Sequence, residues 1–255
     1  MYEHEMTFAR GLADRAAEIG LSVFHGEVRV TIKADLTPVT QADTEIETMI
    51  REQIATAFPD DRVLGEEEGG DASAPGRVWI VDPIDATANF ARRIPIWATL
   101  IALQVEGELV LGLVNAPSLG ERYEAIRGGG ASCNDVPIRV SEVAQIADAQ
   151  ILYAEVDSWL REPRAEGVLG VLRDAKRTRG FGDFWGHVLV SRGAAEAALE
   201  PELALWDYAA PTVVVQEAGG RVTAMDGGPL RHGGSVLSSN GAVHDQLVRQ
   251  IAVSG

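Results

Sequence analysis

The chain has 255 residues, and 38 acidic side chains against 22 basic ones give it a formal net charge of −16. This charge argues against nucleic acid or an anionic membrane as a partner, because both are themselves negative. A hydrophobic content of 46% suits a globular protein with a sizeable core, and no apolar run approaches the roughly 20 residues that a bilayer-spanning helix needs.

The amino terminus and the cysteine content indicate the compartment. Residues 1–10 carry acids and histidine and lack the apolar middle of a signal peptide. Cys133 is the single cysteine, so an intrachain disulfide is excluded and a reducing environment fits. We therefore expect a cytoplasmic protein.

The first half of the chain is predicted to combine two helices with a sheet. Apolar residues at helical spacing favour a helix over residues 5–23. Thr40 and Asp43 have the spacing of a capping box before a second helix, which Pro59 closes. Alternating or apolar runs predict strands over residues 27–34, 62–65, 78–81, 97–105, 108–115, 121–127 and 131–140. The glycines at 128–130 allow a phosphate cradle, but a hairpin turn is favoured because no Lys-Ser/Thr follows them.

The second half alternates between strands and helices. Residues 141–149 are polar and alanine-rich, and they mark the predicted boundary between two halves, residues 1–145 and 146–255. Strands are predicted over residues 150–154, 195–199, 221–224 and 235–238, and helices over residues 166–176 and 203–218 and from residues 183 and 243. The alternation predicts a layered α/β fold with a mixed sheet in each half.

Residues 78–90, which read V-W-I-V-D-P-I-D-A-T-A-N-F, carry the main chemical signal. Asp82 is expected to end a buried strand, Pro83 to stop the pairing, and Asp85 to follow. Two acids at the end of a core strand cost desolvation unless a cation lies between them. A solvated Asp-Pro turn is the alternative, but Glu66 lies one predicted strand upstream. Ligands that are all oxygen favour a hard cation, magnesium before zinc.

Three motifs spread over most of the chain resemble those of the inositol monophosphatase family, which are magnesium-dependent phosphomonoesterases. Residues 82–90 are similar to the signature D-P-I-D-G-T-x-N-F, residues 65–67 match G-E-E, and residues 206–210 match W-D-x-A-A. The resemblance implies an α-β-α-β-α sandwich of the inositol monophosphatase and fructose-bisphosphatase type. It also implies a homodimer.

The resemblance further implies a ligand set for two or three magnesium ions. The expected ligands are the carboxylates of Glu66, Asp82, Asp85 and Asp207 and the carbonyl oxygen of Ile84. Asp82 would bridge two ions. Asp207 fits on physical grounds as well, because an acid in the first turn of a helix lies near the positive end of its dipole, although an ordinary first-turn acid is the alternative.

The reaction that the resemblance implies is attack of a metal-activated water on phosphorus. Glu66 and Thr87 would orient and deprotonate the water. The backbone N–H groups of Ala86 and Thr87, at the expected start of a short helix, would bind phosphate oxygens. Asp43 would support Thr87 as the third catalytic residue, and a simple helix-start acid is the alternative. Asp207 would contact the substrate as well as the metal.

Three positions depart from the family pattern. Ala86 and Arg93 stand where the family has glycine, and Ala88 replaces a commonly polar residue. Glycine at position 86 permits backbone angles and a close phosphate approach that a Cβ hinders. Because no carboxylate is lost, metal binding is expected to survive. The departures bear on rate. Ala86 and Arg93 are the features that favour the alternative, a metal-binding but catalytically impaired relative used for assembly or regulation.

The segments around Glu66, Asp183 and Glu200 most resemble the histidinol-phosphatase branch of the family, which implies histidinol phosphate, in histidine biosynthesis, as the substrate. Acids at positions 183 and 200 could meet an amine and an imidazolium. The neighbouring aromatic pair Phe184 and Trp185 is assigned to the same role. The alternative is a buried helix start with Asp183 as its N-cap. Inositol monophosphate is the alternative substrate, and its neutral polyol needs only hydrogen bonds.

Overall fold

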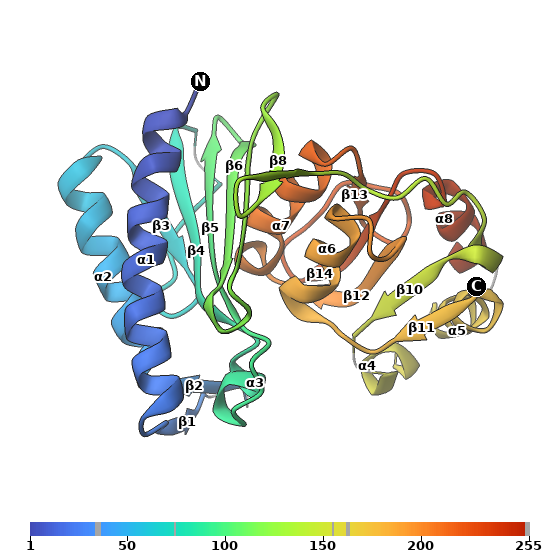
Figure 1. The fold of residues 1–255 in the computed structure, drawn as a ribbon, viewed down its shortest axis with the longest axis horizontal. Helices are drawn as coiled ribbons and strands as arrows, with labels where there is room; N and C mark the ends of the chain where they lie inside the picture. Colours follow the sequence, from blue (N-terminus) through green and yellow to red (C-terminus); the bar gives the residue numbers. More distant parts are fainter. Residues whose placement is uncertain (34–36, 74, 155, 162–163, 253–255) are drawn as a thin grey trace.

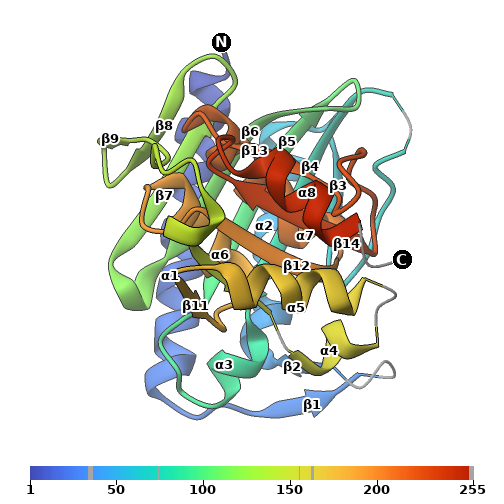
Figure 2. The same ribbon diagram turned by 90° about the vertical axis from the view of Figure 1, so that its right-hand side faces the viewer.

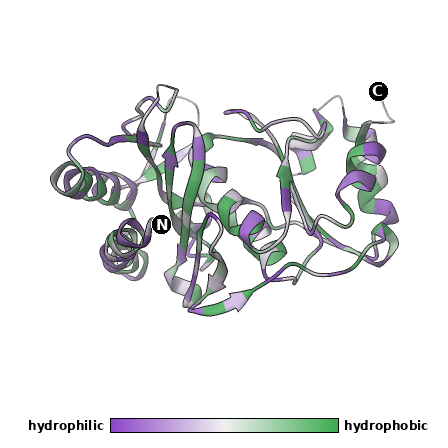
Figure 3. Ribbon diagram, turned by 90° about the horizontal axis from the view of Figure 1, so that it is seen from above, coloured by the Kyte–Doolittle hydropathy of each residue, from purple (hydrophilic) through white to green (hydrophobic). Residues whose placement is uncertain are grey.

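Layers of helices and layers of β-sheet alternate across the computed structural model (Figures 1 and 3). The structure describes residues 1–33, 37–73, 75–154, 156–161 and 164–252. The helices of these layers are α1 (Glu3–His25), α2 (Gln41–Ala57), α5 (Ala165–Asp174), α6 (Asp183–Ser191), α7 (Leu205–Glu217) and α8 (His244–Ala252). Helices α1 and α2 cover the outer face of a first sheet, and α6 and α7 lie between it and a second sheet. Helices α5 and α8 cover the far face of the second sheet (Figure 2).

The outer helices follow the predicted pattern closely. The helix predicted over residues 5–23 is confirmed as α1, which is slightly longer at both ends. The predicted capping box of α2 is present: Thr40 Oγ1 accepts from the amide of Ala42, and Asp43 Oδ2 accepts from the amide of Thr40. The apolar face of α2 is fully buried and consists mainly of Ile46, Ile50 and Ile54.

The first sheet is mixed, because β3 and β4 are parallel and the later neighbours are antiparallel. In spatial order its strands are β3 (Arg62–Gly65), β4 (Arg77–Asp85), β5 (Ala98–Val105), β6 (Glu108–Ala116), β7 (Glu121–Ile126), β8 (Gly130–Cys133) and β9 (Val136–Ile138). The hairpin turn predicted at residues 128–130 is confirmed. The strand predicted over residues 131–140 is broken in two, because Asn134 and Asp135 adopt φ angles of 49° and 63° and form a turn.

Strand β4 does not end at Asp82, which corrects the sequence prediction. It continues through Pro83 to Asp85, and the pairing with β5 shifts register between Asp82 and Asp85. Proline has no N–H to donate to a sheet, and a bulge is one of the few places where a strand tolerates it. The irregularity therefore lets both aspartates lie within one buried strand.

A short antiparallel ribbon contacts the short helix α3 (Thr87–Ala91), which follows this end of β4. It consists of β1 (Val30–Ile32) and β2 (Pro38–Thr40). The strand predicted over residues 27–34 is thus much shorter, and part of the prediction lies outside the described residues.

The second sheet is also mixed, since β10 is parallel to both neighbours and the other pairs are antiparallel. In spatial order its strands are β11 (Arg177–Arg179), β10 (Gln150–Tyr153), β12 (Ala197–Leu203), β14 (Gly234–Ser239) and β13 (Arg221–Thr223). The strand predicted over residues 195–199 starts later and runs past Glu200, which shortens the helix predicted from residue 203. The short helix expected to start at Ala86 and Thr87 is confirmed as α3 (Thr87–Ala91). The short elements η1 (Pro117–Leu119), η2 (Ile146–Asp148), α4 (Val156–Leu160) and β11 were not predicted.

The central helices join the two sheets through one apolar core. Phe184 and Val188 of α6 and Val213 of α7 pack in the same buried cluster as Leu100 of the first sheet. A Cβ at Gly112 of β6 would lie 2.4 Å from a backbone oxygen of α7, so this glycine permits the close approach. The approach places the start of α7 next to the end of β4. The division at residue 145 stays a prediction.

None of the described helices has the length and apolar character that crossing a membrane requires.

Candidate active site

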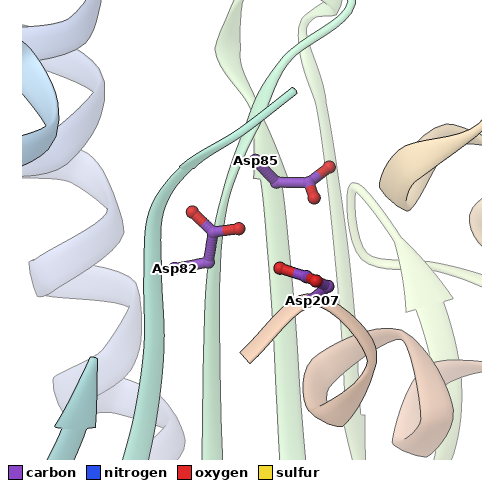
Figure 4. A group of neighbouring side chains, drawn as sticks. All are labelled: Asp82, Asp85 and Asp207. Carbon is purple, nitrogen blue, oxygen red and sulfur yellow. The ribbon is translucent and has the colours of Figure 1, made fainter. Parts of the chain in front are cut away.

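Three aspartates meet where β4 ends and α7 begins (Figure 4). Asp82 and Asp85 project from β4, and Asp207 lies in the first turn of α7. Each offers one carboxylate oxygen, and these oxygens all lie within 4.8 Å of one another. Asp82 and Asp85 are almost completely buried. We call these residues the aspartate cluster.

Burial and mutual repulsion dominate the electrostatics of the cluster. Burial raises the pKa of Asp82 well above its usual range, and the charges of Glu66 and Asp85 raise it further. Burial also raises the pKa of Asp85 strongly, with the charge of Asp183 as the next cause. Burial and the charge of Glu66 raise the pKa of Asp207 to about 7. The ionised cluster is therefore unfavourable without a compensating positive charge.

The residues of the cluster fit a hard divalent cation. Asp82 Oδ1 is buried and has no hydrogen-bond partner among the described residues. Such an oxygen, beside two further acids, costs free energy unless a cation compensates it. The cluster offers oxygen ligands alone, which suits magnesium or manganese better than zinc.

Backbone amides orient two of the carboxylates. The amide of Phe184, in α6, donates to Asp85 Oδ2 at 2.9 Å. The amide of Ala204 donates to Asp207 Oδ2 at 2.7 Å. Each amide donates to one carboxylate oxygen and so orients the side chain. The second oxygen of each carboxylate is left for a cation.

Glu66, the fourth predicted carboxylate ligand, is paired with a lysine. Lys33 Nζ lies 2.9 Å from Glu66 Oε1 and 2.6 Å from Glu67 Oε1. Burial alone would lower the pKa of Lys33, but the hydrogen bonds to Glu67 and Glu66 raise it. Glu66 lies outside the 4.8 Å group, although it lines a cavity of about 700 Å³ together with Lys33 and Asp207. We call it the Asp207 cavity, and the role of Glu66 as a ligand stays a prediction.

Sequence reasoning missed Lys33 and also Glu47. The partners of Lys33 are Glu66 and Glu67, which lie in the turn after β3. They are far from Lys33 in the chain, so no local sequence pattern indicated this contact. Glu47 is fully buried in α2, and its carboxylate accepts from the amides of Glu67 and Glu68. An acid on the otherwise apolar face of a predicted amphipathic helix was the signal that could have found it.

The expected contact between Asp43 and Thr87 is present. Thr87 Oγ1 lies 3.2 Å from Asp43 Oδ1 and 2.9 Å from the carbonyl oxygen of Ile84, the predicted backbone ligand. Asp43 is fully buried, and its other oxygen holds Thr40 at the start of α2. The same carboxylate therefore caps the helix and contacts Thr87, so the two interpretations of Asp43 are compatible. Burial raises the pKa of Asp43.

Two of the departures from the family pattern adopt the backbone conformation that favours glycine. Ala86 has a φ of 66° immediately before α3, and Arg93 has a φ of 63° after it. For L-residues this left-handed conformation costs roughly 1–2 kcal/mol. Arg93 gains compensating contacts, because its guanidinium donates to the carbonyl oxygens of Val23 and Gly26 at the end of α1. Ala88 is exposed on α3, and nothing in the structure explains that substitution.

Asp183 and Glu200, the predicted substrate residues, line a second cavity of about 590 Å³, which we call the Glu200 cavity. Its lining also includes Asn89, Tyr153, Phe181 and Leu203. Glu200 lies in β12 and is 3% exposed. The Asp207 and Glu200 cavities share Ser158, Pro201 and Glu202 in their linings, so they adjoin.

The aromatic part of the substrate prediction needs correction. Phe184 is fully buried in the core between the sheets, and Trp185 packs against that core. The aromatic side chains that line the Glu200 cavity are those of Tyr153 and Phe181. Gly182, rather than Asp183, is the residue that caps α6. Asp183 is the first helical residue and lines the cavity.

This fold and this carboxylate cluster define a phosphatase of the inositol monophosphatase type. The model of the inositol monophosphatase family matches residues 1–254, and the chain belongs to that family. The chain is 41% identical to the histidinol-phosphatase of Mycobacterium tuberculosis, over 98% of this chain and 99% of that protein. It is 40% identical to the histidinol-phosphatase of Streptomyces coelicolor, over 97% of this chain and 96% of that protein.

Solved structures agree with this assignment of the fold. The extragenic suppressor protein SuhB from Bartonella henselae superimposes with a TM-score of 0.89 at 28% identity, covering 98% of this chain and 99% of that one. The IMPase of Thermotoga maritima superimposes with a TM-score of 0.89 at 29% identity, covering 98% of each chain. The predicted fold class is confirmed.

Proposed function

We propose that the chain is a magnesium-dependent phosphatase that hydrolyses histidinol phosphate. The observation that carries the proposal is the aspartate cluster, in which a buried oxygen of Asp82 lacks a partner among the described residues, beside a cavity lined by Asp183 and Glu200. The relatives named histidinol-phosphatase, at 41% and 40% identity over nearly the whole chain, support the choice of substrate.

The proposed metal ligands are the aspartate cluster, Glu66 and the carbonyl oxygen of Ile84. Two or three magnesium ions would bind there. When bound, magnesium supplies Lewis acidity towards phosphate oxygens and lowers the pKa of a water ligand. Glu66 completes the set when its carboxylate leaves Lys33, whose charge otherwise neutralises it.

The residues around Thr87 are proposed to position the attacking water. The single hydroxyl proton of Thr87 can be donated to Asp43 or to the Ile84 carbonyl, so the lone pairs of Thr87 Oγ1 stay available to accept from water. Glu66 is the proposed acceptor of the water proton. The backbone N–H groups of Ala86 and Thr87 are proposed to bind phosphate oxygens, because the first amides of a helix lack intrahelical partners.

The Glu200 cavity is proposed to select the alcohol portion of the substrate. Histidinol carries an amine and an imidazole, and carboxylates at positions 183 and 200 offer both of them charge-assisted hydrogen bonds. Inositol is a neutral polyol and would leave a buried carboxylate such as that of Glu200 without a cationic partner from the ligand. The chain is nevertheless 34% identical to the inositol-1-monophosphatase of Bacillus subtilis, so inositol monophosphate is the second candidate.

Location and assembly complete the proposal. We propose a cytoplasmic homodimer, which the family resemblance supports. Light scattering coupled to size-exclusion chromatography tests the assembly, and a monomeric mass would contradict it.

A turnover assay tests the proposed function. The purified chain is given histidinol phosphate, inositol 1-phosphate and phenyl phosphate, each with magnesium and with a chelator. We expect histidinol phosphate to be hydrolysed with the highest kcat/KM, and only with magnesium. Faster hydrolysis of inositol 1-phosphate would overturn the substrate. Absence of turnover on every ester, with magnesium still bound, would instead favour the catalytically impaired relative.

A further inference from the structure

Helix α2 places a buried carboxylate, that of Glu47, against the backbone of the turn that carries Glu66. Glu47 is 0% exposed. Its Oε2 accepts from the amide of Glu67 at 2.7 Å, and its Oε1 accepts from the amide of Glu68 at 2.9 Å. Both donors immediately follow Glu66 in the chain, so the carboxylate holds the backbone of this turn rather than the side chains of the turn.

The turn is shaped to receive this carboxylate. A Cβ at Gly65 would lie 2.3 Å from Glu47 Oε1 and 2.7 Å from Oε2, so a glycine there leaves the room that the carboxylate occupies. The amides and carbonyls of Gly65 and Gly69 bond reciprocally at 3.0 and 3.1 Å and close the turn. Arg51, one helical turn after Glu47, donates to Glu47 Oε1 and to the carbonyl oxygen of Gly69.

Glu47 and Arg51 therefore hold the backbone of residues 65–69, and Glu66 of the same turn lines the Asp207 cavity. A turn with two glycines of its own, Gly65 and Gly69, has more backbone freedom than other residues would allow. Removing that freedom before a ligand binds lowers the entropic cost of binding.

We propose that Glu47 is a positioning residue: by holding the amides of Glu67 and Glu68, it fixes the turn that presents Glu66 to a cation bound at the aspartate cluster. The inference rests on the proposed function, because it takes Glu66 as a metal ligand. It concerns the pre-organisation of that ligand, and Glu47 itself touches neither metal nor substrate.

The test compares cation affinity with stability in matched variants. Glu47→Gln keeps the shape of the side chain but replaces one acceptor oxygen with an NH₂ group, so one of the two amides loses its partner. Glu196→Gln is the control: Glu196 is also buried, and its carboxylate also accepts a backbone amide, that of Gln150, but it lines neither the Asp207 nor the Glu200 cavity. Binding of Mn²⁺, which shares the oxygen preference of magnesium, is titrated by electron paramagnetic resonance, and melting is followed by circular dichroism.

We expect Glu47→Gln to weaken Mn²⁺ binding about tenfold, as the loss of residues that orient metal ligands commonly does, and Glu196→Gln to leave it unchanged. Both substitutions are expected to lower the melting temperature. Unchanged Mn²⁺ affinity in a folded Glu47→Gln variant would overturn the inference, because a purely structural carboxylate affects only melting. If the wild-type protein does not bind Mn²⁺ at all, the proposed function itself fails, and the inference fails with it.

A measurement on the wild-type protein needs no substitution and decides the question if Glu47→Gln does not fold. Hydrogen exchange at the amides of Glu67 and Glu68 is followed in chelator. We expect both amides to be protected without metal, and to the same extent after magnesium is added. Rapid exchange in chelator that slows only with magnesium would show that the cation, rather than Glu47, orders the turn, and would overturn the inference.

Discussion

The backbone amide of Phe184 donates a hydrogen bond of 2.9 Å to Asp85 Oδ2, although 99 positions separate the two residues in the chain. Phe184 lies next to Asp183 at the start of α6, and Asp183 lines the Glu200 cavity. One bond therefore ties a carboxylate of the aspartate cluster to the helix that borders the proposed substrate cavity. The proposed metal site and the proposed specificity site are built as one unit, and the predictions below separate their contributions.

Removal of the metal is expected to abolish turnover. Chelation should stop hydrolysis, and added magnesium should restore it. Asp82→Asn should lower kcat/KM on the order of a thousandfold, since a metal contributes several kcal/mol to the transition state at about 1.4 kcal/mol per factor of ten. Asp43→Asn should cost only about ten- to a hundredfold, because Asp43 acts through Thr87. Full turnover in chelator, or equal losses in the two variants, would contradict the metal assignment.

Asp82→Asn is expected to lower turnover but to stabilise the metal-free protein. Asp82→Asn removes one charge from a buried cluster in which burial and neighbouring acids both disfavour ionisation. In chelator the variant should melt at a higher temperature than the wild type, and added magnesium should raise the melting temperature of the wild type alone. Melting curves with and without magnesium check this. A variant that is less stable in chelator would show that Asp82 contributes to the fold itself.

Ala86→Gly is expected to raise turnover if the Cβ of Ala86 crowds the phosphate. Relief of the left-handed backbone gains roughly 1–2 kcal/mol, and the greater freedom of glycine in the unfolded chain costs roughly 0.5–1 kcal/mol. The net stabilisation should therefore stay near 1 kcal/mol or less, with magnesium affinity nearly unchanged. Thr87→Ala, by contrast, should lower turnover, because the hydroxyl that orients water is lost.

Arg93→Gly is the matched control for this prediction. It relieves the same backbone conformation but removes the contacts of Arg93 with the end of α1. It should leave turnover unchanged and give no gain in stability. If Ala86→Gly is no faster than the wild type in an active enzyme, this backbone tolerates alanine.

Glu200→Gln is expected to change substrate choice. A carboxylate that faces a substrate ammonium in a partly dry pocket makes a contact worth about 1.5–3 kcal/mol, or roughly ten- to a hundredfold in kcat/KM. The variant should lose most of this factor on histidinol phosphate and little on phenyl phosphate, because the aspartate cluster is untouched. Measuring kcat/KM for both esters on both proteins decides the question. An equal loss on the two esters would make Glu200 a structural acid.

Because His187 is buried, we expect the protein to lose stability in acid. Burial lowers the pKa of His187 to about 4, and Nδ1 lies 2.7 Å from Ser238 Oγ. Because the unfolded histidine binds its proton near pH 6.5, the stabilisation is fully present above that pH and is lost as the pH falls towards 4. The loss should approach about 3 kcal/mol, from 1.36 kcal/mol for each pH unit.

The contribution of His187 to the free energy of unfolding is isolated by comparing the wild type with a variant that lacks this histidine. The raised pKa of Asp207 makes the metal-free protein more stable as the pH falls below about 7, which opposes the effect of His187. Urea unfolding of the wild type and of His187→Gln is therefore compared at several pH values. The wild type should lose stability relative to the variant between pH 6.5 and 4. A constant difference over this range would mean that His187 does not titrate on unfolding.

Local patterns in the sequence determined the elements and motifs whose signals lie within one segment. The spacing of apolar residues predicted α1, and Thr40 with Asp43 predicted the start of α2. The D-P-I-D and W-D motifs identified the three aspartates that the fold brings together. The reason is that helix periodicity, capping and ligand chemistry are each expressed over a few consecutive residues.

Tertiary structure decided the features that depend on what lies opposite a residue. Pro83 remains inside β4 because its neighbour β5 accommodates a bulge. Phe184 turned out to be core and Phe181 to line the cavity, although both belong to one aromatic segment. The partners of Glu47 come from a turn at the end of another strand. Burial and pairing are set by contacts between elements that are far apart in the chain. They therefore cannot be inferred from the spacing of residues along one segment.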